Sequence, residues 1–285
     1  MIYIFIIINI SCISNTDGMS KSEDIRISQI DFERGLSKIK EDTTLGTTYL
    51  ISIGIDTYIS ENWHNLRYAV SDAKGIYDSF PELNNKLLII NENATKANIE
   101  KSILHFLNVM KEQDVLIIYI ANHGLMDEND HYFIPHDGTM EMKDGKAILN
   151  NESNISSDWL NKLLFQYVKY NSLNFVLILD SCNSGSMGFD IRRSYNANTG
   201  AGAILFFSCS PLEYSFEMFS LQHGVFTFEI IEGLRGNADK NKDGKITFRE
   251  LYDYVYSRVQ SRTNGKQNPA LIGAMRSSII IKENY

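Results

Sequence analysis

Two short polar motifs come after runs of apolar residues, and between them they hold a thiol and an imidazole. Residues 180–185 read Asp-Ser-Cys-Asn-Ser-Gly after one such run, and residues 122–124 read Asn-His-Gly after another. A free thiol is only a few per cent ionised at neutral pH, and a neighbouring imidazole raises its reactivity by taking the proton. The two motifs therefore predict that Cys182 is a nucleophile and that His123 is its general base.

Backbone N–H groups beside these two residues can stabilise the negative charge that develops on a carbonyl oxygen during attack. Gly124 has no side chain, so a substrate carbonyl can approach the backbone closely there. The N–H groups of Gly124 and Cys182 are the candidate oxyanion hole, in which each donor contributes about 10²–10³-fold to the rate. Cys182 or His123 alone would more simply be a buried core residue, but their matching positions favour catalysis.

Strands and helices alternate along the chain, and they must position the two motifs. Apolar runs predict strands at 49–55, 86–90, 115–120, 175–179 and 203–207. Helical spacing of apolar residues predicts helices at 71–80, 95–110 and 156–170. The strand runs are apolar throughout, which indicates an α/β fold with a parallel sheet buried between two layers of helices. Functional groups of such a sheet gather beyond the carboxyl ends of its strands, where both motifs fall.

Composition and charge limit the class of protein. The 285 residues are 44% hydrophobic and 22% charged, which is ordinary for a globular domain. The net charge of -8 argues against nucleic acid as a partner. Three cysteines are too few, and odd in number, for a disulfide framework. Cys209 follows another apolar strand and is expected to be a small buried residue.

The two motifs resemble those of the caspase-like cysteine peptidases, the superfamily of caspases, metacaspases and their bacterial relatives. Further segments that resemble this family lie at 50–58, 65–73, 132–137, 208–210, 223–227, 233–236 and 267–269. The resemblance spans residues 47–282 and implies a three-layer αβα sandwich with a mostly parallel central sheet. It also implies peptide-bond hydrolysis through an acyl-enzyme, with no cofactor required for the chemistry. Asn122 departs from the family pattern, in which a small residue is more usual.

The same resemblance bears on the side chain that precedes the cleaved bond. In metacaspases the carboxylate two residues before the cysteine lines the pocket for that side chain, and Asp180 holds this position here. An acidic pocket binds Arg or Lys through charge-assisted hydrogen bonds, so the expected partners are protein or peptide substrates. Asp72 is the candidate second acidic wall, or else a charge at a helix N-terminus. Arg67 is evidence against a basic preference, because an arginine near the pocket would select acidic substrates. The alternative is that Arg67 is a solvated surface charge.

Residues 239–250 match the twelve-position loop of an EF-hand calcium site. A glycine stands at position 6 of the loop, and a glutamate closes it at position 12. The candidate metal ligands are Asp239, Asn241, Asp243, Lys245, Thr247 and Glu250. Segments 226–234 and 248–256 on either side are expected to be helices. Calcium is thus the one cofactor that the sequence suggests, although a single loop binds weakly and a similar loop in bacterial caspase-like proteins also serves as a helix connector.

The chain divides into a leader or linker, 1–46, and a caspase-like domain, 47–285. The first ten residues are nearly all apolar, a run too short to span a bilayer but similar to a signal-peptide core. Ser11-Cys12 would then be the processing or lipidation site, which implies export or membrane attachment through the N-terminus. The first basic residue is Lys21, so the usual basic start is missing. A leading strand, a misassigned start and a cytoplasmic location therefore stay open.

Three other histidines are interpreted without a catalytic role. The polar segments 131–155 and 190–202 read as loops, which places His131 and His136 in a loop. No cysteine or close carboxylate cluster in the sequence completes a zinc site around them. His223 and the glycine after it imitate the candidate catalytic dipeptide, but they precede a helix and are interpreted as a turn.

The function that these patterns favour is a cysteine endopeptidase that cleaves after Arg or Lys. The first alternative is a calcium-responsive signalling or binding module with a vestigial peptidase site, which the intact Cys182 and His123 motifs disfavour. The second is an acyl transferase or ligase on the same fold, because ligation and hydrolysis pass through the same acyl-enzyme. The sequence does not indicate the oligomeric state.

Overall fold

Six strands form the central sheet in the computed structural model, which describes residues 46–126, 130–143, 146–171, 173–181, 202–210, 213–274 and 280–283. In spatial order they are β14 (Ala270–Ala274), β10 (Ala203–Phe207), β9 (Asn174–Asp180), β3 (Val115–Ala121), β1 (Thr48–Gly54) and β2 (Lys86–Ile90). The last five pair in parallel, and β14 runs antiparallel to β10 at one edge. The mostly parallel sheet that the sequence predicts is confirmed.

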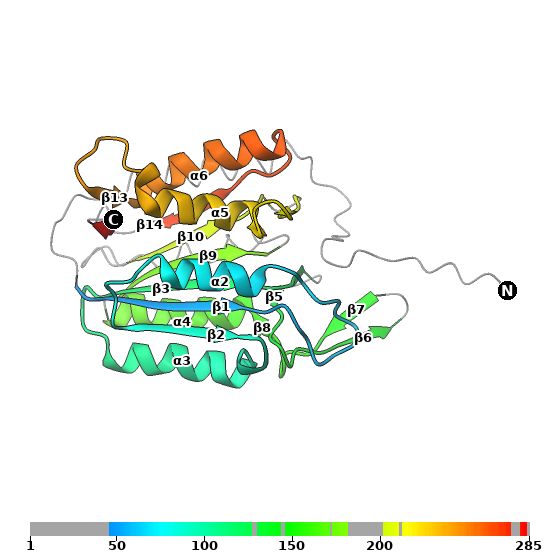
Figure 1. Cartoon of the computed structure of the whole chain (residues 1–285). Helices are drawn as coiled ribbons and strands as arrows, with labels where there is room; N and C mark the ends of the chain where they lie inside the picture. The colour runs from blue at the N-terminus through cyan, green and yellow to red at the C-terminus, as the bar shows by residue number, and fades with distance from the viewer. Residues whose placement is uncertain are drawn as a thin grey trace.

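Helices cover both faces of this sheet and complete a three-layer sandwich (Figure 1). One face carries α2 (Ala69–Asp78), α5 (Val225–Glu232) and α6 (Phe248–Thr263). The other carries α3 (Lys96–Val109) and α4 (Ser157–Asn171). The helices predicted from apolar spacing are all present, with ends that differ by one or two residues.

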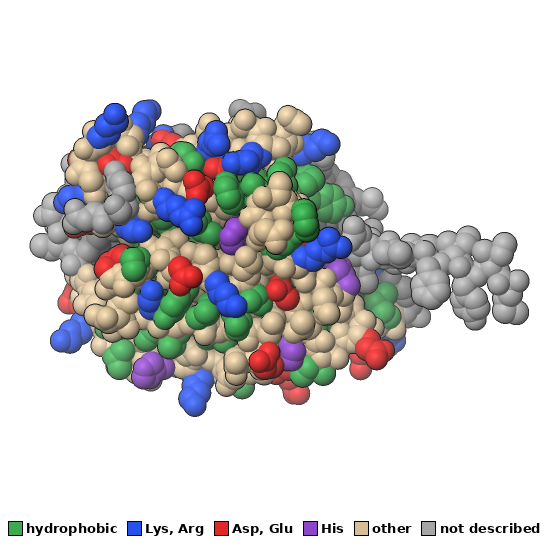
Figure 2. All heavy atoms as spheres, viewed as in Figure 1, with side chains coloured by type: hydrophobic (Ala, Val, Ile, Leu, Met, Phe, Trp, Pro, Cys, Tyr) green, Lys and Arg blue, Asp and Glu red, His purple; other side chains and the backbone are tan. Residues whose placement is uncertain are grey.

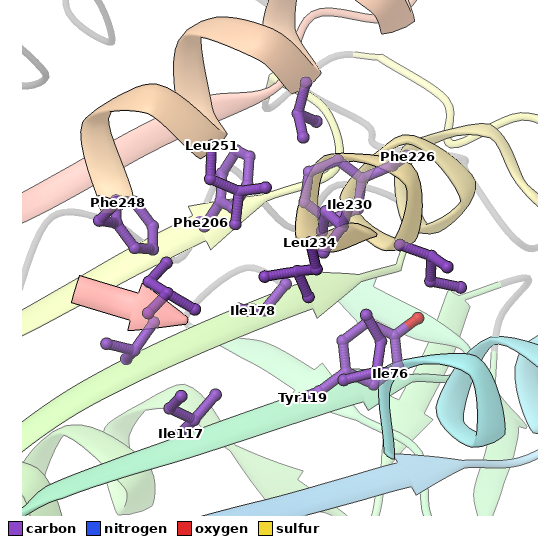
Figure 3. Close-up of a cluster of buried hydrophobic side chains, with 14 of the residues drawn as sticks. Ile76, Ile117, Tyr119, Ile178, Phe206, Phe226, Ile230, Leu234, Phe248 and Leu251 are labelled. Atoms are coloured by element: carbon purple, nitrogen blue, oxygen red, sulfur yellow. The ribbon is translucent and has the colours of Figure 1, made fainter. Parts of the chain in front are cut away.

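The continuous apolar runs follow from burial on both faces of the sheet. Every residue of β3 is buried. Its side chains alternate between two cores: Ile117 and Tyr119 lie under α2 and α5, while Leu116 and Ile118 lie against α3 and α4. Figure 3 shows the first of these cores, in which side chains from the strands meet those of the three covering helices. Each large apolar side chain buried in this way stabilises the fold by about 1.5–3 kcal/mol.

Local sequence signals fix where the helices begin and end. Helix α3 begins after Thr95, whose hydroxyl accepts a hydrogen bond from the N–H of Asn98 at 3.3 Å. Helix α6 begins with a capping box formed by Thr247 and Glu250, and it ends at Asn264 in the left-handed conformation, with φ 52°. The predicted helices on either side of the EF-hand-like loop are therefore confirmed.

The segment 131–155, which the sequence predicts as loops, contains short strands. They are β5 (His131–Phe133), β6 (Met140–Lys143), β7 (Lys146–Leu149) and β8 (Ile155–Ser156), and β5 also pairs with β4 (Gly124–Met126). Met140 and Leu149 are buried in a small third core with Trp63 and Tyr132. The prediction was wrong because this core is assembled from single apolar residues between polar ones, which leaves no periodic pattern.

Smaller elements complete the fold. Strands β11 (Glu217–Met218) and β12 (His223–Gly224) form a hairpin, and β13 (Lys245–Thr247) pairs with β15 (Ile280–Glu283). Helix α5 continues into the π-helical segment η5 (Gly233–Asn237), while the 3-10 turn η2 (Asn91–Asn93) follows β2. The hairpin matters most here, because it lies at the candidate site.

Acidic and basic side chains are interspersed on the molecular face that Figure 2 shows. Some of them form exposed ion pairs, such as Lys162 with Asp158 and Arg249 with Asp253. Exposed pairs of this kind contribute at most about 1 kcal/mol each. In the described part of the chain, no helix combines the length and the apolar character that crossing a membrane requires.

Candidate active site

A cavity of about 470 Å³ opens at the carboxyl ends of β3 and β9. Ala121 and Asp180 end these two strands and are partners in the sheet register, so the beginnings of the two sequence motifs come side by side. His123, Gly124, Asp180 and Ser181 all line the cavity. Cys182 itself lies outside the described residues, of which Ser181 is the last before it. The structure thus brings His123 and the residues that precede Cys182 to one hollow.

Two hydrogen bonds fix the candidate base His123. Its Nε2 lies 2.8 Å from the backbone carbonyl of His64, and its backbone N–H donates to the hydroxyl of Tyr58 at 3.0 Å. Because a carbonyl only accepts hydrogen bonds, Nε2 carries the ring proton of the neutral imidazole. The other ring nitrogen, Nδ1, therefore keeps the lone pair that a general base needs.

Aromatic rings enclose the same imidazole. The Trp63 ring stacks on it with centroids 5.7 Å apart, and the rings of Tyr58 and His64 lie at 5.0 and 4.6 Å. Burial lowers the pKa of His123 to about 4. The hydrogen bond to the His64 carbonyl acts in the opposite direction, and the charge of the His64 ring lowers the pKa by a smaller amount. His123 is consequently neutral, and able to accept a proton, at neutral pH.

Folding stability should fall as the pH drops from about 6.5 to about 4, in part because of His123. The unfolded chain binds a proton at this residue near pH 6.5, and the folded chain binds it only near pH 4. Lowering the pH past both of these pKa values therefore reduces the free energy of unfolding by about 3 kcal/mol. His123→Gln keeps an amide N–H for the His64 carbonyl but does not titrate. Urea unfolding at pH 7 and pH 4 should show a smaller acid-induced loss for this variant than for the wild type.

The control for this measurement is His105→Gln, because His105 is exposed on α3. Its acid-induced loss of stability should equal that of the wild type. An equal loss in the His123 variant would contradict the lowered pKa.

Hydroxyl groups hold the carboxylate of Asp180. Ser215 donates to one oxygen at 2.6 Å and Thr227 donates to the other at 2.7 Å. The single hydroxyl proton of Thr227 is used in this bond, so Tyr119 is the donor in the 2.6 Å contact between the Tyr119 and Thr227 hydroxyl groups. Burial raises the pKa of Asp180, and these hydroxyl bonds act in the opposite direction.

Asp72, the candidate second wall, lies in the same cavity. Its two oxygens each lie 3.2 Å from the backbone N–H of Gly224, which donates to both. Burial raises its pKa well above the usual value, and the negative charge of Asp180 raises it further. A side-chain carbon at Gly224 would lie 2.8 Å from Asp180 Oδ2 and 3.2 Å from Asp72 Oδ2, so the two carboxylates converge on a point that only glycine leaves open.

Glu217 is a third acidic residue of the cavity, and no sequence pattern pointed to it. It belongs to β11 and reaches the site because it pairs with Gly224 across the hairpin. Burial, followed by the charge of Asp180, raises its pKa, while Arg67 lowers it. Arg67 itself is exposed and is not among the residues that line the cavity.

Residues 49–279 match the family model described as the caspase domain. The chain belongs to the caspase domain family. The match covers the whole central sheet as far as β14 and both sequence motifs, and the family is one of cysteine peptidases. This membership confirms the family resemblance that the motifs indicated.

Two solved structures share the caspase fold of this chain. A crystal structure of a protein from Geobacter sulfurreducens aligns with a TM-score of 0.60 at 14% sequence identity, covering 83% of this chain and 100% of that chain. The crystal structure of the Drosophila initiator caspase Dronc aligns with a TM-score of 0.56 at 13% identity, covering 85% and 92% of the two chains. Identities this low show a shared fold alone. No curated protein sequence matches this caspase domain.

Two further residues of the caspase domain act as structural ties beside the cavity. Asn122 donates its side-chain amide to the carbonyl of Ile134 at 3.0 Å, which fixes the end of β3 to the segment after β5. Cys209 is fully buried, as expected, and its thiol lies 3.2 Å from the carbonyl of Glu213.

Two of the other histidines lie where the sequence did not place them. His131 is buried in β5 rather than in a loop, and only His136 lies in a turn, where its Nδ1 donates to the carbonyl of Thr57 at 2.6 Å. His223 belongs to the two-residue strand β12 rather than to a turn, and its Nδ1 lies 2.6 Å from Asp72 Oδ1. The contact could not be predicted, because it joins residues 151 positions apart.

The EF-hand-like loop satisfies its own polar groups in this caspase domain. Asp239 accepts N–H groups of Lys242 and Gly244 at 2.7 and 3.0 Å, and Asp243 accepts that of Lys245 at 2.8 Å. Glu250 accepts the N–H and the hydroxyl of Thr247 at 3.1 and 2.7 Å. Within the described ranges, no three His, Cys, Asp or Glu side chains are grouped as a metal ion requires. The loop connects η5 with α6, and calcium binding stays a prediction based on its oxygen-rich sequence.

Calcium should raise the melting temperature of the wild type if the loop binds it. An ion at a hundred times its Kd stabilises the folded state by about 2.7 kcal/mol, which corresponds to about 5–10 °C. Glu250→Gln removes the charge at position 12 but retains a side chain able to form the capping box. Thermal melts with and without millimolar calcium should therefore show a shift for the wild type and none for this variant; no shift in either would leave the loop as a connector alone.

Proposed function

We propose that this protein is a cysteine endopeptidase that hydrolyses peptide bonds after Arg or Lys, with Cys182 as nucleophile and His123 as general base. The observation that carries the proposal is one cavity whose wall holds the neutral, hydrogen-bonded His123 together with the carboxylates of Asp72, Asp180 and Glu217. Membership of a family of cysteine peptidases supports the reaction class. The acidic wall supports the choice of substrate.

The reaction begins when Nδ1 of His123 takes the thiol proton of Cys182. The thiolate attacks the carbonyl carbon of the substrate, and the oxyanion accepts hydrogen bonds from the backbone N–H groups of Gly124 and Cys182. The imidazolium then gives its proton to the leaving amine, and the C–N bond breaks to leave a thioester. Water, activated by the same imidazole, attacks the thioester and releases the carboxylic acid and the free thiol.

The hydrogen bonds of His123 support its role in these proton transfers. The bond from Nε2–H to the His64 carbonyl keeps Nδ1 unprotonated before the reaction, and it stabilises the imidazolium after proton uptake. The stacked Trp63 ring keeps the imidazole in one plane. General-base assistance by a residue held in this way contributes about 10²–10⁴-fold to the rate.

The acidic wall favours a cationic side chain because its carboxylates repel one another. Burial and mutual repulsion raise the pKa values of Asp72 and Glu217, and the charge of Arg67 offsets this only in part at Glu217, so the wall as a whole lacks a sufficient counter-charge. A guanidinium or ammonium group placed among them supplies that charge and several N–H donors. Arg presents a planar fork that can bond two carboxylates at once, so it should be preferred to Lys.

A panel of fluorogenic peptides that differ only in the residue before the cleaved bond tests this function. The residues compared are Arg, Lys, citrulline, Gln and Asp. Citrulline is included because it has the shape of Arg without its charge. We expect kcat/KM for Arg to exceed that for citrulline by about 10²-fold or more, because the charge of a desolvated ion pair is lost. Preference for Asp would overturn the assignment of the pocket.

Two additions make the panel more informative. Mass spectrometry of the products, with a peptide amine present, separates hydrolysis from ligation, which share the thioester. Repeating the Arg reaction with and without calcium shows whether the 239–250 loop affects turnover.

A further inference from the structure

The second histidine–glycine dipeptide, His223-Gly224, bonds to the acidic wall of the cavity. Both residues form β12, which places them directly before α5. His223 Nδ1 lies 2.6 Å from Asp72 Oδ1, and the N–H of Gly224 donates to both oxygens of the same carboxylate. The dipeptide thus surrounds Asp72 with two neighbouring donors.

Asp72 needs these donors because of where it lies. It is 3% exposed, and it faces Asp180 across the space beside Gly224. A buried carboxylate next to a second one tends to bind a proton and lose its charge. Hydrogen bonds donated to the ionised form oppose this tendency, and they are strongest when the acceptor is charged.

His223 is suited to donate rather than to form an ion pair. Burial and the charge of Arg235 lower its pKa, so the ring is neutral and carries a single proton. The Asp72 carboxylate, which already accepts the Gly224 N–H, can accept a second hydrogen bond from this proton when it lies on Nδ1 of His223. The His223 side chain is 21% exposed, whereas the Asp72 side chain is only 4% exposed.

We propose that His223 is a positioning residue for substrate binding, which donates a hydrogen bond from Nδ1 to Asp72 and so holds this carboxylate ionised and directed into the cavity. The inference rests on the proposed function, because it assigns Asp72 to the pocket for Arg or Lys. It extends that function to a residue outside the cavity wall, which acts on the substrate only through Asp72.

Two amide substitutions separate this role from simple packing. His223→Asn places an amide N–H where Nδ1 was, whereas His223→Gln places it where Nε2 was. For the Arg peptide we expect KM to rise about tenfold in the Gln variant, with kcat little changed, and to stay near the wild-type value in the Asn variant. With the citrulline peptide the two variants should behave alike.

A double-mutant cycle with Asp72 adds a second requirement. If His223 acts through Asp72, then His223→Gln in an Asp72→Asn background should change KM for the Arg peptide by less than twofold. A further tenfold rise in that background would show an independent action and would overturn the inference.

Binding of benzamidine to Cys182→Ala protein, measured by calorimetry, tests the inference without turnover. We expect affinity about tenfold weaker with His223→Gln and near that of the parent with His223→Asn, both variants having been checked for cooperative unfolding. Equal benzamidine affinity in parent and both variants would overturn the role of His223 and leave the proposed pocket standing. No benzamidine binding by the parent, together with no preference for Arg over citrulline, would overturn both.

Discussion

Replacing Cys182 with alanine is expected to lower kcat/KM for the Arg peptide by about a millionfold, to the limit of detection. The sulfur is the atom that forms the bond to the substrate carbonyl, and neither the acidic wall nor His123 can supply a nucleophile in its place. Substrate binding should persist, because the substitution leaves the described residues of the cavity wall, such as Asp72 and Asp180, unchanged. The measurement is hydrolysis of the fluorogenic peptide, with calorimetric binding of benzamidine as the companion.

Cys209→Ala is the matched control for this substitution. Cys209 is also a thiol at the end of a core strand, but it is fully buried and bonds to the Glu213 carbonyl. Its removal should reduce stability and leave kcat/KM for the folded protein near that of the wild type. Turnover retained in the Cys182 variant, or lost only in the Cys209 variant, would show that the wrong thiol has been assigned.

Asp180→Asn is expected to lower kcat/KM for the Arg peptide by about 10²–10³-fold and to leave the citrulline peptide much less affected. Asp180 accepts hydroxyl protons from Ser215 and Thr227, and it lines the cavity at the strand end nearest Cys182. Removing one partner of a buried, hydrogen-bonded charge pair has an effect of this size. The amide has nearly the same shape, so the ratio of kcat/KM for Arg to that for citrulline isolates the charge.

Asp114→Asn controls for the general effect of neutralising a buried aspartate. Asp114 is 5% exposed and accepts N–H groups of Thr47 and Lys111 far from the cavity, at the opposite end of β3. Its replacement should lower the melting temperature, while the ratio of kcat/KM for the Arg peptide to kcat/KM for the citrulline peptide stays constant. A ratio that changes equally in both variants would show that Asp180 acts through stability and not through substrate recognition.

The central sheet and the positions of the two motifs could be predicted because their causes are local. A strand buried on both faces must be apolar throughout, as β3 and β9 are, and a motif after such a strand must lie at the sheet's carboxyl edge. His123 and Asp180 do lie at this edge, and Asp72 lies in the same cavity, while their roles stay predictions. The helix ends followed from caps such as Thr95.

The remainder of the site depends on pairings that no local pattern records. Glu217 enters the cavity only because a two-residue strand pairs it with Gly224, and His223 meets Asp72 on a helix far earlier in the chain. The short strands between 131 and 155 likewise form around scattered apolar residues such as Met140. Contacts of this kind are determined by tertiary packing, which overrides the weak preferences of short segments.

One strand connects the proposed general base with the proposed specificity pocket. Strand β3 leads directly to His123, and from its interior Tyr119 reaches Thr227, which in turn holds Asp180. The strand is buried along its whole length and bonded on both sides, so it resists bending. Under the proposed function, this strand fixes the distance between the carbonyl that reacts and the side chain that is recognised. We therefore expect that a peptide whose recognised side chain is offset by a single backbone atom, as in a β-amino acid, will not fill the acidic hollow and present its carbonyl at the same time.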